Sequence, residues 1–362
     1  MRIVLIGDGL SPHLLKWARA LAARRVELWV ASSRGFLPGF DGLVAPGRRL
    51  ALGHEAAHAG GNVAVLAKLP RLGAWLRRVD ADWLHAHYLT SHGTLAWLAR
   101  RFWRLRARLV GSAWGSDILV TPERSPAYRW LTRRVLRACA LTTSDSAYMA
   151  RRMAELGAAE VMTFPFGLEA MPPAPPAKSP WLFFANRGLE PLYRPERVLA
   201  LFAAVAAHRP EARLVVANDG SLAATLADQA RQLGLRVGRL DEGAQIEFTG
   251  RLDAAGLAAW YAPARWYLSL PESDSVSVSV LEAMAQGCIP LLSDLPANRE
   301  LVQDGRNGLI VPEDGFEITA LEPLAAAAEA IGRANREWVE RNALFAPSVE
   351  RFLARLRELG PA

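Results

Sequence analysis

Short apolar runs separated by amphipathic helical stretches recur along almost the whole of this 362-residue chain. Each run is shorter than a typical buried helix and is apolar at successive positions, so both of its faces must be covered. Strands of that kind alternating with helices predict parallel sheets with helices on both sides. In the first half the runs lie at residues 2–6, 26–31, 83–87, 109–112, 141–144 and 161–164.

A proline-rich segment, MPPAPPAKSP at residues 171–180, interrupts this alternation, and five of its ten residues are proline. Such a segment forms a stiff, extended linker. The alternation then restarts, with apolar runs at residues 181–185, 213–218, 245–248 and 266–270. We therefore predict an α/β protein of two Rossmann-like, doubly wound parallel-sheet domains that face across a cleft lined by the carboxyl ends of their strands. The expected ranges are 1–168 for the first domain, 169–180 for the linker, 181–335 for the second domain and 336–362 for a helical tail crossing back to the first.

The composition argues against a membrane span and against a disulfide-bonded protein. No stretch approaches the roughly 20 apolar residues of a transmembrane helix. The first apolar run has about five residues before Gly7, and no cleavage site of a signal peptide follows it. Cys139 and Cys288 lie in different halves, which fits a reducing compartment and offers no metal cluster. We expect a cytoplasmic protein, either free or peripheral on the inner face of the cytoplasmic membrane without crossing it.

Charge is distributed unevenly between the halves. Residues 1–175 carry 24 Lys and Arg against 12 Asp and Glu, whereas the remainder carries 19 against 24. Residues 100–108 and 128–137 interleave arginine with aromatic and aliphatic side chains. Such a basic amphipathic surface suits an anionic membrane, although an arginine-rich chain with ordinary solvated helix faces gives the same pattern. No nucleic-acid recognition module is evident, so a nucleic-acid partner is not expected.

The segment from Pro271 to Asp294 carries the strongest chemical signal. A strand is expected to end at Leu270, and a polar loop then leads into a helix that begins near Ser277 and stops at Gly287. The unpaired amides and positive dipole end of a helix N-terminus suit a phosphate group. Glu282 lies about one turn into this helix, where it can reach a diol, and Asp274 lies eight residues earlier. Together they predict a cradle for a sugar, a diphosphate and a ribose.

This segment, and LEAMAQGCIP within it most closely, resembles the signature of the retaining GT-B glycosyltransferases of family 4. The resemblance implies that Glu282 holds the donor ribose, that Asp274 contacts sugar hydroxyls, and that amides near Ser277 and Val278 hold the sugar and diphosphate. The chain departs from the family pattern at Asp274, where the family has glutamate, and at Ser275 and Ser277, where it has glycine. The departures bear on the identity of the sugar.

Other donor contacts follow from the same resemblance. Arg187 and Arg194 match a basic pair that binds the diphosphate in the family, and fixed cations stabilise a departing diphosphate without a metal. Asp274 and Arg187 are candidate catalytic residues as well as donor contacts. The remaining expected donor contacts are the glycine-rich turns and one further arginine: Gly7, Gly9, Gly220, Gly250 and Arg251.

The acceptor is expected at the first domain. His13 and His87 are candidate acceptor contacts, although a buried structural role for His87 is equally open, and no third ligand supports a metal site with His85. Trp114 stands where many family members have histidine, and we include it among the acceptor contacts. Asp117 matches a family aspartate that orients the acceptor or takes its proton, and the alternative is a helix-capping role.

The sequence therefore predicts a metal-independent, retaining glycosyltransferase with no cofactor. Its partners would be a nucleotide-diphosphate sugar donor and a glycan or lipid-linked acceptor, as in surface polysaccharide assembly. Two alternatives stay open: a nucleotide-sugar epimerase of the same architecture, and a non-catalytic subunit that keeps the fold. The base, the sugar, the acceptor, the linkage and the oligomeric state are not determined by the sequence.

Overall fold

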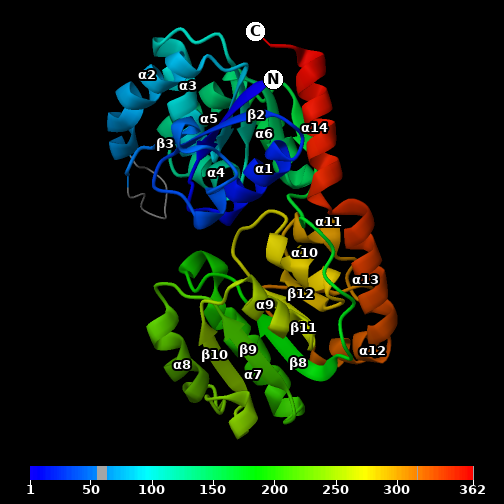
Figure 1. Ribbon diagram of the computed structural model, residues 1–362. Helices are drawn as coiled ribbons and strands as arrows, with labels where there is room; N and C mark the ends of the chain where they lie inside the picture. Colours follow the sequence, from blue (N-terminus) through cyan, green and yellow to red (C-terminus); the bar gives the residue numbers. More distant parts are fainter. Residues whose placement is uncertain (55–62, 316, 362) are drawn as a thin grey trace. The chain divides into compact units, whose positions relative to one another are not determined.

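The protein is described here by a computed structural model that places residues 1–54, 63–315 and 317–361 (Figure 1). Residues 55–62 of the expected first domain, Phe316 and Ala362 lie outside the described residues. Contacts divide the chain into two compact units, Met1–Phe164 with Phe345–Ala362, and Pro165–Leu344. The first unit is therefore built from two separate stretches of the chain.

A seven-stranded sheet in the order β3-β2-β1-β4-β5-β6-β7 forms the centre of the first unit. All of its neighbouring strands pair in parallel. The order reverses between β1 and β4, where Leu5 pairs with His85. The strands are β1 (Arg2–Gly7), β2 (Glu27–Ser32), β3 (Arg49–Ala51), β4 (Trp83–His87), β5 (Arg108–Ser112), β6 (Cys139–Ser144) and β7 (Val161–Thr163).

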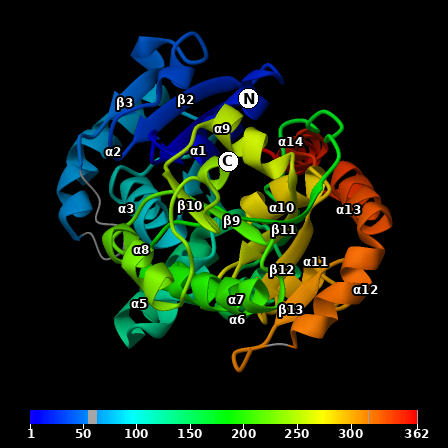
Figure 2. The same ribbon diagram turned by 90° about the horizontal axis from the view of Figure 1, so that it is seen from below.

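Helices cover both faces of this sheet. On one face, buried side chains of β1 and β4 such as Val4 and Leu84 share a core with five helices: α2 (Leu69–Val79), α3 (Thr94–Phe102), α4 (Ser116–Leu119), α5 (Pro126–Ala138) and α6 (Ala147–Glu155). On the other face, Trp17 of α1 (Pro12–Ala22) packs against Phe345 and Phe352 of α14 (Phe345–Leu359). The last helix, red in Figure 1 and Figure 2, thus completes the core of the first unit.

Local sequence signals set the starts of several helices. Ser11 and Ser125 stand at the N-cap positions of α1 and α5, and each accepts a hydrogen bond from a backbone amide of the first turn. A proline follows each serine, at the first helical position, where its missing amide hydrogen costs nothing. Ser146 caps α6 in the same way.

The second unit has a six-stranded sheet in the order β10-β9-β8-β11-β12-β13, again parallel throughout. The order reverses between β8 and β11. The strands are β8 (Ser179–Ala185), β9 (Arg213–Ala217), β10 (Ile246–Gly250), β11 (Ala264–Ser269), β12 (Ile289–Ser293) and β13 (Leu309–Val311).

Alternate side chains of these strands enter two different cores. Phe183 and its equivalents on neighbouring strands join one core with α7 (Pro195–His208), α8 (Ala223–Gln232) and α12 (Leu321–Ala326). Phe184 and its equivalents join the other core with α9 (Ala254–Tyr261), α10 (Val278–Ala285), α11 (Asn298–Leu301) and α13 (Ala328–Asn342). This burial on both faces of the sheet explains why the strands are apolar at successive positions.

The predicted fold class is confirmed, since both sheets are parallel and doubly wound. The three-residue strands β3 and β13 were not predicted, because so short an apolar stretch does not stand out from a loop. Helices α12 and α13 belong to the second unit, and α14 belongs to the first. Among the described residues, no helix is both long enough and apolar enough to span a membrane.

Replacing Phe352 by alanine tests the packing of α14. This side chain is fully buried, and its ring lies 5.1 Å from the rings of both Trp17 and His85. We expect Phe352→Ala to lower the unfolding free energy of the first unit by about 3–5 kcal/mol, measured by urea denaturation with tryptophan fluorescence. Phe102→Ala is the matched control, because that ring is 66% exposed, and should cost less than about 0.5 kcal/mol. Equal losses would contradict the packing described.

Candidate functional site

The carboxyl ends of β8 and β11 mark the point at which the strand order of the second sheet reverses. In doubly wound folds a ligand binds at such a point, because the loops leaving the two strands turn to opposite faces and open a crevice. Arg187 follows β8, and the loop from Leu270 to Ser277 follows β11. The residues singled out from the sequence therefore come from two loops that meet at this position.

Arg187 joins these two loops. Its Nη2 donates to Oδ2 of Asp274 at 2.7 Å, and its Nη1 donates to the hydroxyl of Ser277. The guanidinium carbon also lies 4.5 Å from the centre of the Tyr193 ring, a cation–π distance. Three residues predicted for donor binding are thus brought together, and Tyr193 is an addition that no sequence motif marked.

Asp274 is mostly buried, and burial raises the pKa of its carboxyl above the ordinary value. Arg187 and the backbone amide of Ser275 act in the opposite direction, since both stabilise the charged form. The pair is therefore mutually dependent: each charge is held in a poorly solvated place chiefly by the other.

Helix α10 begins at this cluster with Ser277 at its N-cap position. The Ser277 side chain makes no capping bond to the helix, and its hydroxyl is engaged by Arg187 instead. The first turn of α10 therefore has no side-chain cap, although the backbone carbonyl of Ser277 accepts the amide of Val280 at 3.1 Å. Next to a fixed guanidinium, a helix N-terminus of this kind suits a doubly charged anion such as a diphosphate.

Glu282 lies in the second turn of α10, and its Oε2 accepts a hydrogen bond from the hydroxyl of Tyr261 at 3.1 Å. Tyr261 is the last residue of α9 and is itself bonded to Asn186, the residue before Arg187. Neither Tyr261 nor Asn186 was predicted. Asn186 could have been noticed in the sequence because it lies next to Arg187 at the end of a strand. Tyr261 could not, because only tertiary packing brings it to Glu282.

Arg194 does not join the Arg187 cluster in this structure. Its guanidinium pairs with the carboxylate of Glu313 at 2.9 Å, and its backbone is left-handed at φ 49° immediately before Pro195. The resemblance implies that Arg194 is a second diphosphate contact. Such a contact would require its guanidinium to break the ion pair with Glu313.

The predicted glycines of the second unit shape the neighbouring loops. A Cβ on Gly220 would lie 2.4 Å from the carbonyl oxygen of Leu189, so glycine permits the loops after β8 and β9 to pack closely. Gly250 ends β10 at φ +68°, and its carbonyl accepts the amide of Asn218 at 2.7 Å. Arg251, which follows, is exposed.

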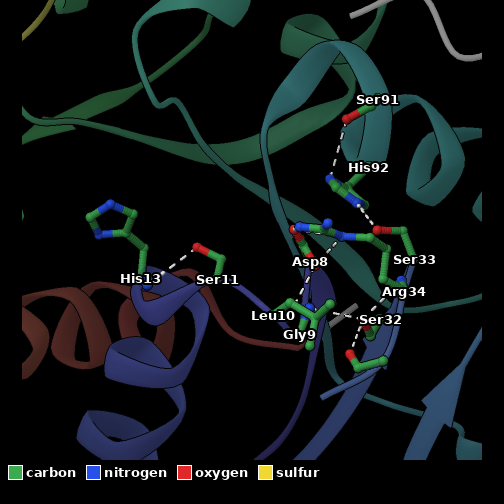
Figure 3. A network of polar contacts seen from close by, with 11 residues as sticks. Asp8, Gly9, Leu10, Ser11, His13, Ser32, Ser33, Arg34, Ser91 and His92 are labelled. Carbon is green, nitrogen blue, oxygen red and sulfur yellow. Dashed lines mark hydrogen bonds and ion pairs between the residues drawn. The ribbon is translucent and has the colours of Figure 1, made fainter. Parts of the chain in front are cut away.

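Gly7 and Gly9 flank the turn after β1, at the reversal point of the first sheet. The space that a Cβ on Gly9 would need is filled by the loop after β2, with the carbonyl of Gly35 only 2.3 Å away. Between the glycines, Asp8 forms a two-pronged ion pair with Arg34, and Nε of Arg34 lies 3.0 Å from Oδ1 (Figure 3). Gly9 is therefore needed for packing within the unit itself, whereas a Cβ on Gly7 would meet a methyl group of Leu14 at 2.8 Å.

The three predicted acceptor contacts lie close together: His13 is on α1, His87 ends β4 and Trp114 follows β5. The ring of Trp114 lies 4.7 Å from that of His13 and 5.9 Å from that of His87. His87 is 4% exposed, and neither of its ring nitrogens has a hydrogen-bond partner in the part of the chain that the structure describes. Burial lowers the pKa of His87 well below its ordinary value, so it is neutral at neutral pH.

Asp117 is fully buried and connects two loops. Its Oδ2 accepts the amide of Leu89 at 2.7 Å, and its Oδ1 accepts the amide of Trp114 at 2.9 Å. Burial raises the pKa of Asp117 to about 6, although the backbone amides act to lower it. With both oxygens engaged by backbone, the carboxylate can fix the loop that carries Trp114.

Two doubly wound parallel sheets, each with polar residues at its reversal point, define the GT-B class of fold. The first unit matches the model of the glycosyl transferase 4-like domain over residues 8–167, and the second matches that of glycosyl transferases group 1 over residues 169–342. Together the two matches take in most of the chain, which belongs to the family-4 glycosyltransferases of the GT-B fold.

Among curated relatives, the phosphatidyl-myo-inositol mannosyltransferase of Mycobacterium tuberculosis is 31% identical over 147 residues, which are 40% of this chain and 36% of the relative. The alignment thus spans about a third of that relative's length. The protein of the same name from Mycobacterium leprae is 26% identical over 325 residues, 85% of this chain and 80% of the relative.

Solved structures support the same fold. HepE of Anabaena in complex with UDP has a TM-score of 0.74 at 13% identity, covering 98% of this chain and 100% of its own. The pneumococcal O-GlcNAc transferase GtfA, with UDP and GlcNAc, has a TM-score of 0.74 at 11% identity, covering 99% of each chain. At such identities the likeness shows the fold alone.

The raised pKa of Asp117 predicts a pH dependence of stability. The folded protein holds this proton more tightly than the unfolded chain, whose pKa is near 3.8. The stability that the group contributes is therefore present below pH 4 and lost as the pH rises through 6, a change of about 3 kcal/mol. Asp117→Asn cannot titrate, so the unfolding free energy of the wild type relative to this variant should fall by that amount between pH 3 and pH 7. Urea denaturation across this range measures it, and parallel pH curves for the two proteins would contradict the burial described.

Proposed function

We propose that this protein is a metal-independent, retaining glycosyltransferase that moves a sugar from a nucleotide-diphosphate donor to a hydroxyl acceptor. The observation that carries the proposal is the junction of Arg187, Asp274 and Ser277 at the N-terminus of α10, with Glu282 one turn further along. Membership in the family supports it.

Each residue of the junction has a proposed task. The guanidinium of Arg187 and the first amides of α10 would bind the diphosphate and stabilise the charge that develops on it as the glycosidic bond breaks. Because Asp274 and Ser277 already fix the guanidinium, little reorganisation is needed during the reaction. Glu282 would accept hydrogen bonds from ribose hydroxyls, and Asp274 would contact the sugar.

The first unit would bind the acceptor. His13, His87 and Trp114 supply an aromatic surface for the acceptor, and the buried imidazole of His87 would support the ring of Trp114 from within the unit. We assign Asp117 a positioning role, because its two oxygens hold the backbone of Leu89 and Trp114.

The names of the relatives suggest which donor to test first. Several are mannosyltransferases, one of them named as GDP-mannose-dependent, and the HepE and GtfA structures contain UDP. We propose GDP-mannose as the first donor and UDP-sugars as the second, with a lipid-linked glycan as acceptor in polysaccharide or glycolipid assembly.

The two arginines after β8 provide a matched pair of variants. Arg187→Lys keeps a positive charge but cannot contact Asp274 and Ser277 together, so we expect kcat/KM for the donor to fall about 100-fold or more. Arg194→Lys should change it less than about threefold, because that guanidinium is paired with Glu313. Donor consumption with a membrane extract as acceptor measures both, and NMR of the product gives its anomeric configuration.

Thermal shift with GDP and UDP tests the donor site before any acceptor is known. One of them should stabilise the wild type, and Glu282→Ala should reduce the shift. If no nucleoside diphosphate stabilised the wild type, the donor-site proposal would be wrong and a non-catalytic subunit would be favoured. Donor conversion without any acceptor would instead indicate an epimerase or a hydrolase.

We further propose that the protein works at the cytoplasmic face of an anionic membrane. Helix α5 presents Trp130, which is 54% exposed, with Arg134 packed over its ring at 5.3 Å. Arg133 is exposed on the same helix, and Phe102 is exposed at the end of α3. Exposed aromatic rings among arginines suit the boundary between lipid headgroups and acyl chains.

Vesicle binding tests this surface. We expect the wild type to sediment with vesicles containing phosphatidylserine and much less with phosphatidylcholine alone, with binding that weakens in salt. Arg133→Glu combined with Arg134→Glu should lower the affinity more than about tenfold, at roughly 1 kcal/mol for each charge. The matched control is Arg239→Glu, an exposed arginine of the second unit. Equal affinity for both vesicle types would contradict the proposal.

A further inference from the structure

A buried hydrogen-bond chain of three side chains leads to Glu282. The hydroxyl of Tyr267 donates to Oδ1 of Asn186 at 2.6 Å, and Nδ2 of Asn186 donates to the hydroxyl oxygen of Tyr261 at 2.8 Å. The hydroxyl of Tyr261 lies 3.1 Å from Oε2 of Glu282 and 3.2 Å from the carbonyl oxygen of Ser279. The chain is continuous from the middle of the sheet to the carboxylate.

Burial fixes the direction of this chain. Asn186, Tyr261 and Tyr267 are 6%, 3% and 0% exposed, so each polar atom must find its partner within the protein. Because the Tyr261 oxygen accepts from Asn186, its single proton is left for Glu282 or for Ser279, and the charged carboxylate is the stronger acceptor. Burial, Tyr267 and Glu282 raise the pKa of Tyr261 well above its ordinary value, which keeps that proton on the ring at neutral pH.

The chain ties together the elements that surround the reversal point of the second sheet. Asn186 follows β8, Tyr267 lies on β11, Tyr261 ends α9, and Glu282 belongs to α10. Asn186 and Arg187 are successive residues, so two adjacent side chains act on the two carboxylates of the site, those of Asp274 and Glu282. Arg187 contacts Asp274 directly, and Asn186 acts on Glu282 through Tyr261.

We propose that Tyr261 is a positioning residue that orients the carboxylate of Glu282 towards the ribose hydroxyls of the donor nucleotide. The inference rests on the proposed function, in which Glu282 holds the ribose. A half-buried glutamate such as Glu282 still has several rotamers open to it, and ordering it only on binding would weaken the complex. A hydrogen bond from a buried tyrosine fixes the carboxylate before the nucleotide arrives.

Tyr261→Phe tests the proposal when it is combined with a change in the ligand. Binding of GDP and of UDP is measured by calorimetry, each against its 2′,3′-dideoxy counterpart, which lacks the hydroxyls that Glu282 would hold. For the nucleotide that binds, the wild type should prefer the ribose form by about tenfold. In Tyr261→Phe we expect affinity for the ribose form to fall about five- to tenfold while affinity for the dideoxy form changes less than twofold, so the preference nearly disappears.

A merely structural role for Tyr261 would weaken both ligands equally, and that result would overturn the inference. Tyr267→Phe is the second variant, because it removes only the far end of the chain and leaves the bond between Tyr261 and Glu282. Tyr267→Phe should therefore reduce the ribose preference less than Tyr261→Phe does. If Tyr261→Phe does not fold, Tyr267→Phe takes its place in the test. An unchanged ribose preference in Tyr267→Phe would then contradict the proposed role of the hydrogen-bond chain. A wild type that binds no nucleoside diphosphate would refute the proposed function itself. A wild type that binds the ribose and dideoxy forms equally would refute only the role of Glu282 and Tyr261.

Discussion

The ion pair between Arg187 and Asp274 connects the loops that leave β8 and β11, the two strands at which the second sheet reverses its order. Removal of either charge would leave the other in a poorly solvated place, which is costly. The same guanidinium engages the hydroxyl of Ser277, and so the N-terminus of α10 is left uncapped by its own serine. Charge, helix dipole and loop conformation at the candidate donor site thus depend on one contact.

The local sequence pattern predicted those elements whose structure depends on neighbouring residues in the chain. Apolar runs gave the long strands, because double burial leaves a signal in consecutive residues such as Phe183 and Phe184. The segment around Glu282 combined a loop, a helix start and a carboxylate at fixed spacing. In the structure, Asp274 and Ser277 of this segment both contact Arg187, which a separate part of the sequence had singled out.

Side-chain contacts between residues that only tertiary packing brings together could not be predicted from local sequence. Tyr261 lies 21 residues from Glu282 in the sequence, and nothing in its own neighbourhood marks it as a partner of that carboxylate. Arg194 had the expected residue type and position, yet Glu313, 119 residues away, competes for its guanidinium. Asp117 was open between a chemical and a structural role, and only its burial and its two backbone donors favour the latter.

Because the first unit consists of two separate stretches of the chain, it cannot complete its folding on the ribosome until the second stretch has been made. Residues 1–164 leave the ribosome first, but the aromatic rings of Phe345 and Phe352 that cover Trp17 are made after the whole second unit. One face of the first sheet therefore stays partly uncovered during the translation of some 180 residues, which takes about 10–40 s at typical translation rates. The unit that begins synthesis first is the one that can finish folding only last, and chaperones or early aggregation would act on it during that interval.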